Sequence, residues 1–246
     1  MTKPRQLLHA EARRTSRSVY SDKGIRRYKL DSGPMLIFPS RGSYLSIEAS
    51  LPKLVYGNNI NALPAHLACE ALSKPFQELV ELVQLEQEGL KVEESPLARL
   101  DIVRDFDDVS HIQELILGHD SVYRPGFYVD VPHDGDSPVR ALYIKKYRGA
   151  GSGGKWVYET KSYGKHAENP AAPVGRFRYE VTLRHGATGT LAKMAGGRMT
   201  RVRDVTEERL EAVARATFED ARMGATVVLP DGRSARLSFD HGQIHH

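Results

Sequence analysis

The sequence has few of the features that assign a chain to a disulfide-rich, secreted or membrane class. Its single cysteine, Cys69, excludes an internal disulfide and is typical of a reducing compartment. No apolar run approaches the roughly 18 residues of a membrane-spanning helix. The first ten residues also lack the apolar segment of a secretory signal peptide. These absences predict a cytoplasmic protein that has no membrane partner.

A phosphate-binding loop is also missing, although one stretch resembles it. Residues 149–155 have the spacing Gly-x-x-x-x-Gly-Lys, but Trp156 follows where the loop needs Ser or Thr to bind Mg²⁺. A strand pattern also follows where the loop requires a helix. The stretch is therefore interpreted as a glycine-rich connection, and the sequence shows no internal repeat.

What the chain does have is an ordinary globular composition with an uneven charge. Its 246 residues are 40% hydrophobic and 27% charged, which fits one large domain or two small ones. The net charge is only +4, yet residues 1–30 hold nine Lys or Arg and two acids. Such a segment suits phosphate contacts with a nucleic acid. A solvated leader explains it equally well, and the sequence does not decide between the two.

Hydrophobic periodicity predicts many short strands and few helices. The period of two indicates strands at 35–38, 44–50, 97–106, 123–131, 140–148, from 156, and 176–184, with a hairpin at 226–239. Helical patterns cover 64–88, 110–117 and 206–223. Pro75 is expected to kink or divide the first, and Gly89 and Gly118 are expected to end the first two. Residues 240–246 are expected to be a frayed tail. The predicted class is α+β: a mainly antiparallel sheet with helices on one face and a polar face opposite.

The residues that could act as metal ligands or nucleophiles lie on that polar face. Alternation places Glu48, Asp101 and Glu180 on it from different strands, and Lys161, Tyr163 and Lys165 share one face of the strand that begins near residue 156. Carboxylates of this kind are hard oxygen ligands that suit Mg²⁺ or Mn²⁺. The alternative is a solvated face with weak ion pairs, each contributing roughly 0–1 kcal/mol.

Four blocks in order resemble the filamentous-phage gene II/X replication initiators and their plasmid rolling-circle relatives. The blocks lie at residues 47–59, 98–102, 163–168 and 177–184, and include an Arg-x-Asp and a Tyr-x-Lys-His-x-Glu pattern. Each block is short, and their order and spacing carry the match over roughly residues 44–184. Residues 1–30 and the last sixty or so residues lie outside it, and the phage initiators are longer chains.

The resemblance implies a site-specific, metal-dependent endonuclease that nicks one strand of a replication origin. A tyrosine would attack the phosphate, giving a 5′-phosphotyrosyl intermediate and a free 3′-OH. By motif, Tyr163 is the nucleophile, assisted by Lys165; Tyr158 takes that role only if the register differs. The metal ligands would be Asp101 and Glu180, with Glu48 as a third.

Further residues and partners follow from the same hypothesis. We expect DNA contacts from Arg99, Arg176, Arg178, Lys53 and Asn58, although a turn explains the asparagine equally well. The sequence shows no helicase motif, so a host helicase and polymerase would act as partners in a bacterial cell. The His-x-His metal motif of another nickase class, within an apolar strand, is also absent. The expected organisation is an arm at 1–30, a nuclease domain at 31–200, and a C-terminal helix and hairpin at 201–246 packed on it. A mobilisation relaxase of the same chemistry, or a non-catalytic DNA-binding regulator, would fit the same residues.

Overall fold

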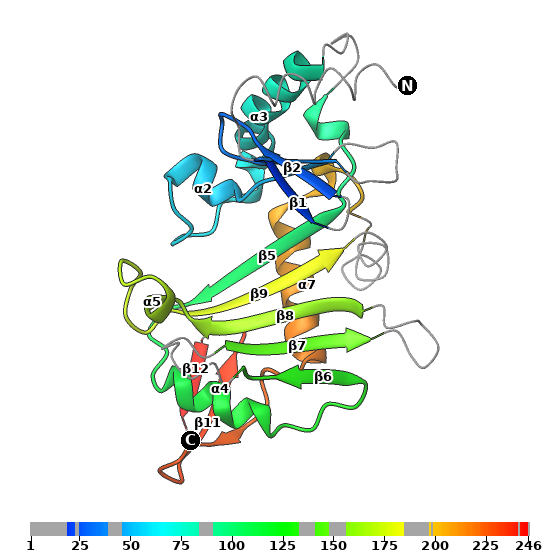
Figure 1. The fold of residues 1–246 in the computed structure, drawn as a ribbon. Coiled ribbons are helices and arrows are strands. Elements are labelled where there is room, and N and C mark those ends of the chain that lie inside the picture. The colour runs from blue at the N-terminus through cyan, green and yellow to red at the C-terminus, as the bar shows by residue number, and fades with distance from the viewer. Residues whose placement is uncertain are drawn as a thin grey trace. The chain divides into compact units, whose positions relative to one another are not determined.

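The computed structural model describes residues 19–22, 25–38, 46–83, 91–132, 141–147, 156–184, 197, 199–240 and 242–245 (Figure 1). The chain divides into two compact units. The N-terminal unit comprises residues 1–96 with 201–203, and the C-terminal unit comprises residues 97–200 with 204–246. This division differs from the predicted one, because the boundary lies at Pro96 rather than at residue 30 or 200.

The N-terminal unit contains an antiparallel sheet and helices. The described strands pair in the order β1-β2-β3-β4, with bounds Val19–Asp22, Ile25–Lys29, Met35–Phe38 and Ser46–Glu48. Its helical elements are α2 (Leu51–Tyr56), η1 (Ala65–Leu67), α3 (Ala68–Val83) and η2 (Val92–Glu94). Strands β1 and β2 fall within the predicted basic arm. Part of that segment is therefore a structural strand pair rather than a solvated leader.

Two helices of this unit differ from the sequence prediction. Helix α2 was not predicted, although Pro52 in its first turn and Gly57 at its end, with φ of 74°, are ordinary helix boundary signals. Helix α3 continues through Pro75 instead of dividing there. Pro75 is itself buried, and Ala68 and Val80 are buried on either side of it. Packing along the whole helix thus outweighs the loss of one backbone hydrogen bond. The predicted end at Gly89 lies outside the described residues.

The C-terminal unit is built on a five-stranded antiparallel sheet. The order of its described strands is β5-β9-β8-β7-β6, with bounds Arg99–Phe106, Phe177–Arg184, Trp156–Gly164, Ala141–Tyr147 and Phe127–Asp130. The other elements of this unit are α4 (Ile112–Asp120), α5 (Lys165–Glu168), α7 (Glu207–Asp220), β10 (Val227–Val228), β11 (Ser234–Ser238) and β12 (Gly242–His245). The residues of η3 (Val202–Asp204) are divided between the two units. The predicted α+β class, with a mainly antiparallel sheet, is confirmed.

One face of the five-stranded sheet is apolar and is covered by helices. Its core residues pack with α4, α7, β10 and β11 in a single cluster. Phe218 of α7, for example, lies 5.5 Å from the ring of Tyr179 and 6.0 Å from that of Phe106, measured between ring centroids. Helix α7 runs behind the sheet in the view of Figure 1. The predicted arrangement of helices on one face and polar side chains on the other is therefore present in this unit.

Two predictions for this unit were wrong: the end of the helix at Gly118 and the frayed C-terminal tail. Helix α4 continues through Gly118 to Asp120, and a Cβ atom at Gly118 would lie only 2.8 Å from Cβ of Val227. The glycine therefore permits close packing of β10 rather than ending the helix. The expected frayed tail instead forms β12, which pairs with β11, so its backbone groups gain hydrogen-bond partners. No helix among the described residues is long and apolar enough to cross a membrane.

Candidate active site

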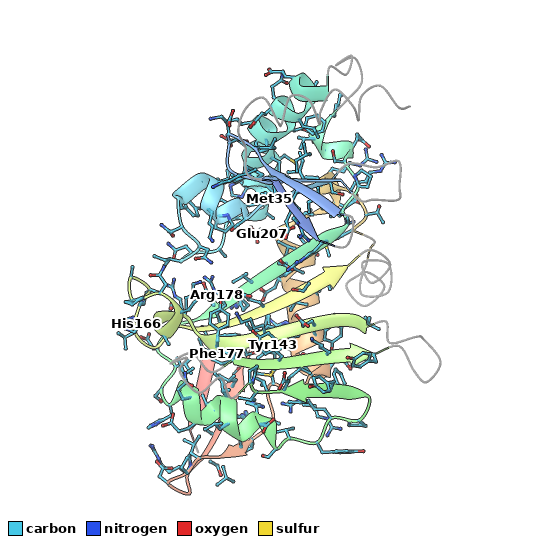
Figure 2. The ribbon with its side chains drawn as sticks, viewed as in Figure 1. Met35, Tyr143, His166, Phe177, Arg178 and Glu207 are labelled. Carbon is cyan, nitrogen blue, oxygen red and sulfur yellow. The ribbon has the colours of Figure 1, made fainter. Side chains whose placement is uncertain are left out.

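The polar face of the five-stranded sheet is arranged in cross-strand rows. One row runs Asp105–Arg178–Tyr163–Ala141, because each residue lies directly opposite the next on the neighbouring strand. The adjacent row contains Glu180 opposite Lys161, which in turn lies opposite Tyr143. Arg178 and Tyr143 are labelled in Figure 2. The register therefore brings Tyr163 and Glu180 together as diagonal neighbours on adjacent strands.

Tyr163 is a buried phenol that contacts a carboxylate. Its side chain is part of a residue that is only 1% exposed, and its hydroxyl donates a hydrogen bond of 2.7 Å to Oε1 of Glu180. Burial, followed by the charge of Glu180, raises the pKa of Tyr163 above its usual value. The phenol is thus neutral at physiological pH, and Glu180 is placed to accept its proton.

Two ammonium groups lie against the Tyr163 ring. Nζ of Lys161 is 4.3 Å from the ring centroid and Nζ of Lys165 is 5.7 Å from it. Lys161 projects from β8, but Lys165 does not continue the strand alternation, because β8 ends at Gly164 and α5 begins at Lys165. Lys165 is fully buried, and its ammonium forms an ion pair with Glu168 at the end of the same helix. Predicted nucleophile and predicted assistant are therefore neighbours.

The third cation beside Tyr163 is already neutralised. Arg178 is 2% exposed, and its guanidinium donates two hydrogen bonds, of 2.7 and 2.8 Å, to the carboxylate of Asp105. Such a two-point pair is geometrically specific. Since Arg178 lies below the surface, it presents no open face to a DNA phosphate in this conformation. Its expected DNA contact therefore has no support from its position.

Asp101 lies on the same face as Tyr163 but not beside it. It is opposite Thr182, and four residues of β5 separate it from Asp105, which lies in the Tyr163 row. At about 3.4 Å per residue, that is about 14 Å along the strand, with two strand spacings to cross in addition. Arg99 binds the Asp101 carboxylate through hydrogen bonds of 3.0 and 2.8 Å, and both side chains are 46% exposed. Asp101 and Tyr163 therefore do not converge.

The remaining predicted residues lie elsewhere. Glu48 belongs to β4 of the N-terminal sheet, so the expectation that one sheet carries Glu48, Asp101 and Glu180 was wrong; periodicity does not reveal which sheet a strand joins. Lys53 lies in α2. The Asn58 side chain closes a turn, donating to the Tyr56 carbonyl and accepting from the Ile60 amide. Arg176 pairs with Asp107, its Nε lying 2.7 Å from Oδ1.

The predicted metal ligands do not form a metal centre in this arrangement. Among the residues that the structure describes, no group of three or more His, Cys, Asp or Glu side chains is placed to hold a metal ion. Glu180 accepts from Tyr163, and Asp101 is engaged by Arg99. Mg²⁺ or Mn²⁺ dependence therefore stays a prediction.

Two acidic residues of the site were missed as functional candidates. Glu168 lies next to the Tyr163 hydroxyl and Asp105 completes the Arg178 pair. The signal for Glu168 was its spacing of three residues from Lys165, which places both side chains on one face of a helical turn. Asp105 shares the strand alternation of Asp101 on β5. Only the register distinguishes the two aspartates, and the sequence does not give it.

Tyr158, the alternative nucleophile, lies on the opposite, apolar face. It is fully buried, and its hydroxyl donates a hydrogen bond of 2.7 Å to Oδ2 of Asp220 at the end of α7. Lys146 forms an ion pair with the same carboxylate. Burial, followed by the hydrogen bond to Asp220, raises the pKa of Tyr158. This tyrosine joins the sheet to the helix that covers it.

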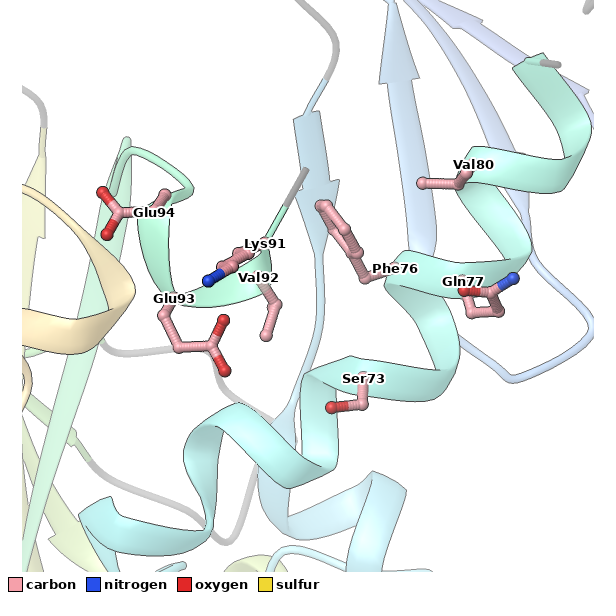
Figure 3. Close-up of a pocket in the computed structure, with 8 residues that line it drawn as sticks. All are labelled: Ser73, Phe76, Gln77, Val80, Lys91, Val92, Glu93 and Glu94. Carbon is pink, nitrogen blue, oxygen red and sulfur yellow. The ribbon is translucent and has the colours of Figure 1, made fainter. Parts of the chain in front are cut away.

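A separate cavity of about 650 Å³ lies in the N-terminal unit (Figure 3). Its lining comes from α3 and from the segment around η2: Ser73, Phe76, Gln77, Val80, Lys91, Val92, Glu93 and Glu94. None of the predicted site residues contributes to it. The chemistry predicted from the sequence therefore concerns the sheet face, not this cavity.

The described geometry thus consists of a neutral phenol, a carboxylate that accepts its hydrogen bond, and ammonium groups against its ring. Comparisons of the chain with protein-family models, curated proteins and solved structures gave no match.

Proposed function

We propose that the protein is a DNA-nicking enzyme that initiates rolling-circle replication, with Tyr163 as its nucleophile. The observation that carries the proposal is the 2.7 Å hydrogen bond from the Tyr163 hydroxyl to Glu180, formed beside two lysines. A phenol is a weak nucleophile at neutral pH and needs a neighbouring base. Glu180 supplies the base, and cations against the ring favour negative charge on the phenolic oxygen.

The reaction would proceed by transesterification. The Tyr163 oxygen forms a bond to the phosphorus while its proton passes to Glu180. The bond from phosphorus to the 3′ oxygen breaks, and that oxygen takes a proton from water to leave as a 3′-OH. The 5′ phosphate remains as a tyrosyl ester, whose energy allows a later 3′-OH to reverse the step. Moving the proton to Glu180 transfers negative charge within the cluster without changing its sum.

The burial of Tyr163 sets a requirement on this function. A phosphodiester reaches the phenolic oxygen only when the side chains around it move, so DNA binding must uncover a residue that is 1% exposed here. Catalytic contacts often form fully only in the substrate complex. The same burial favours the second candidate, a DNA-binding regulator in which this cluster has a purely structural role.

The test is nicking of DNA taken from the neighbourhood of the gene. Supercoiled plasmid and single-stranded oligonucleotides covering that DNA are incubated with protein in Mg²⁺, Mn²⁺ or chelator. We expect a nicked product and a covalent adduct that mass spectrometry assigns to Tyr163. Tyr163→Phe removes both while DNA binding persists, because the change deletes one hydroxyl and no charge.

The matched control is Tyr158→Phe, which removes an equivalent hydrogen bond from the other face and keeps the adduct. If the adduct is lost in Tyr158→Phe but not in Tyr163→Phe, the nucleophile is Tyr158 on the apolar face. Binding without nicking under every metal condition would instead establish the DNA-binding regulator. Genes beside this one that encode transfer functions would favour mobilisation over replication.

A further inference from the structure

The turn after β8 gives the Tyr163 cluster a second carboxylate. Because α5 starts at Lys165, its four residues bring Glu168 back toward the sheet, where it lies beside the Tyr163 hydroxyl and binds the Lys165 ammonium. Glu180 and Glu168 therefore flank the same phenol from different elements. Their partners differ: Glu180 accepts from Tyr163 and lies opposite Lys161, whereas Glu168 holds Lys165.

Lys165 depends on this carboxylate. A buried ammonium is costly unless it is paired and hydrogen-bonded, and Lys165 is 0% exposed. The Glu168 side chain is 37% exposed, so it reaches Lys165 from the surface. Although its partial burial acts in the opposite direction, the hydrogen bond and charge of Lys165 hold the pKa of Glu168 below its usual range. Glu168 is therefore ionised at neutral pH.

We propose that Glu168 is a positioning residue for the reaction at Tyr163, because it holds the Lys165 ammonium against the phenol ring. This inference rests on the proposed nicking function. When the Tyr163 proton passes to Glu180, the ammonium of Lys165 offsets the negative charge that develops on the phenolic oxygen. Glu168 acts through Lys165 and does not itself take the proton.

Two effects of Glu168 oppose one another, so the sign of the result is informative. The Glu168 charge contributes to raising the pKa of Tyr163, so a purely electrostatic role would make Glu168→Gln react faster at a given pH. A positioning role makes the same variant slower, because Lys165 loses its partner and leaves the ring.

The experiment measures the rate of adduct formation against pH for single and double variants. We expect Glu168→Gln and Lys165→Met each to slow the reaction by about tenfold, which corresponds to ~1.4 kcal/mol in the barrier. Because both changes remove the same ammonium from the ring, the double variant should be no slower than either single one. Glu168→Asp, which keeps a carboxylate, should recover part of the rate.

The control is Glu159→Gln, which removes an ion pair with Lys145 (2.9 Å) on the same sheet face and should leave the rate unchanged. A wild-type or faster rate in Glu168→Gln overturns the inference, as does additivity in the double variant. Circular dichroism checks that each variant is folded. If Glu168→Gln does not fold, the rate is measured in Glu168→Asp instead.

A readout without activity separates this inference from the proposed function. The Tyr163 ring 5.7 Å from Nζ displaces the NMR signals of the Lys165 Cε methylene through its ring current. Glu168→Gln should cancel that displacement and Glu159→Gln should not. If Tyr163→Phe forms the adduct normally, the proposed function fails. If Lys165 stays in place in Glu168→Gln, the positioning role fails while nicking stands.

Discussion

Tyr158 and Tyr163 lie five residues apart on β8, and they form the same kind of phenol–carboxylate hydrogen bond on opposite faces of one sheet. Each hydroxyl donates a hydrogen bond of 2.7 Å to a carboxylate, and each ring has a lysine nearby. The partner of Tyr158 is Asp220, on the helix that covers the apolar face. The partner of Tyr163 is Glu180, on the adjacent strand.

The difference lies in what surrounds each pair. The Asp220 carboxylate is held between Tyr158 and Lys146 and fixes α7 to the sheet, which opposes its unfavourable position at the C-terminal end of that helix. Around Tyr163, by contrast, Lys161, Lys165 and Arg178 gather beside a single phenol. A phenol–carboxylate hydrogen bond alone does not indicate a reactive group. The charges collected around Tyr163 are what distinguish it from Tyr158.

The largest expected effect comes from exchanging the two carboxylates for amides. Glu180→Gln keeps an acceptor for the Tyr163 hydroxyl but removes the base, so the nicking rate of the folded protein should fall by about 10²–10⁴-fold. Asp220→Asn should leave the nicking rate of the folded protein unchanged and lower the free energy of unfolding by about 1.5–3 kcal/mol, because it weakens hydrogen bonds to a charged group. Nicking assays and urea denaturation measure the two quantities. The reverse assignment of effects would exchange the roles of the two faces.

A second prediction concerns the pH dependence of stability, which involves Arg124 and His119 at the C-terminal ends of α4 and α7. Arg124 donates to the carbonyls of Ala221 and His119, and its Nη2 lies 3.0 Å from Nδ1 of His119. Burial, followed by the charge of Arg124, lowers the pKa of His119 to about 3 from its ordinary 6.5. The unfolded chain therefore binds the proton more readily. The contribution of His119 to stability is complete above pH 6.5 and is lost as the pH falls toward 3, by up to ~1.4 kcal/mol per pH unit.

His119→Asn is the control for this prediction, because an amide oxygen can replace Nδ1 as acceptor but does not titrate. Urea denaturation at pH 7, 5 and 4 should show a shallower loss of stability in the variant than in the wild type. Equal slopes would mean that His119 contributes nothing to the loss of stability at low pH.

The smallest effect is expected at Asp101. Its pair with Arg99 is about half exposed, and such surface pairs contribute roughly 0–1 kcal/mol. Because the register separates Asp101 from Tyr163, Asp101→Asn should change nicking much less than Glu180→Gln when both are compared across a Mg²⁺ titration. A loss equal to that of Glu180→Gln would show that Asp101 joins the site when DNA binds, as the resemblance to phage initiators implies.

Much of the C-terminal unit could be predicted from its sequence. The alternation in residues 176–184 and 97–106 gave β9 and β5 with the correct faces, and the pattern of residues 206–223 gave α7. These segments are long and have one buried face, so periodicity is a strong signal. Shorter elements such as α2 and β12 were missed or misread, because their patterns are brief and their partners are distant.

The site was only partly predictable for a related reason. Tyr163 and Glu180 were singled out by motif, but their contact depends on the register of β8 against β9. That register places Arg178, rather than Glu180, directly opposite Tyr163. The register of β5 against β9 then places Asp105, rather than Asp101, opposite Arg178. Glu48 shows the other limit, since a strand pattern carries no information about the sheet it will join.

The strand order also bears on how the protein folds. Strands β6 to β9 are consecutive antiparallel neighbours, whereas β5, which precedes them all, pairs with β9 at the far edge. Neighbouring strands close short loops, while the pairing of β5 with β9 must close a long one, which is slower. We expect the β8–β9 hairpin, with its Tyr163–Glu180 contact, to form before β5 adds Asp105 to Arg178. The Tyr163–Glu180 pair would then be assembled early, and Asp105, which neutralises Arg178, would arrive last.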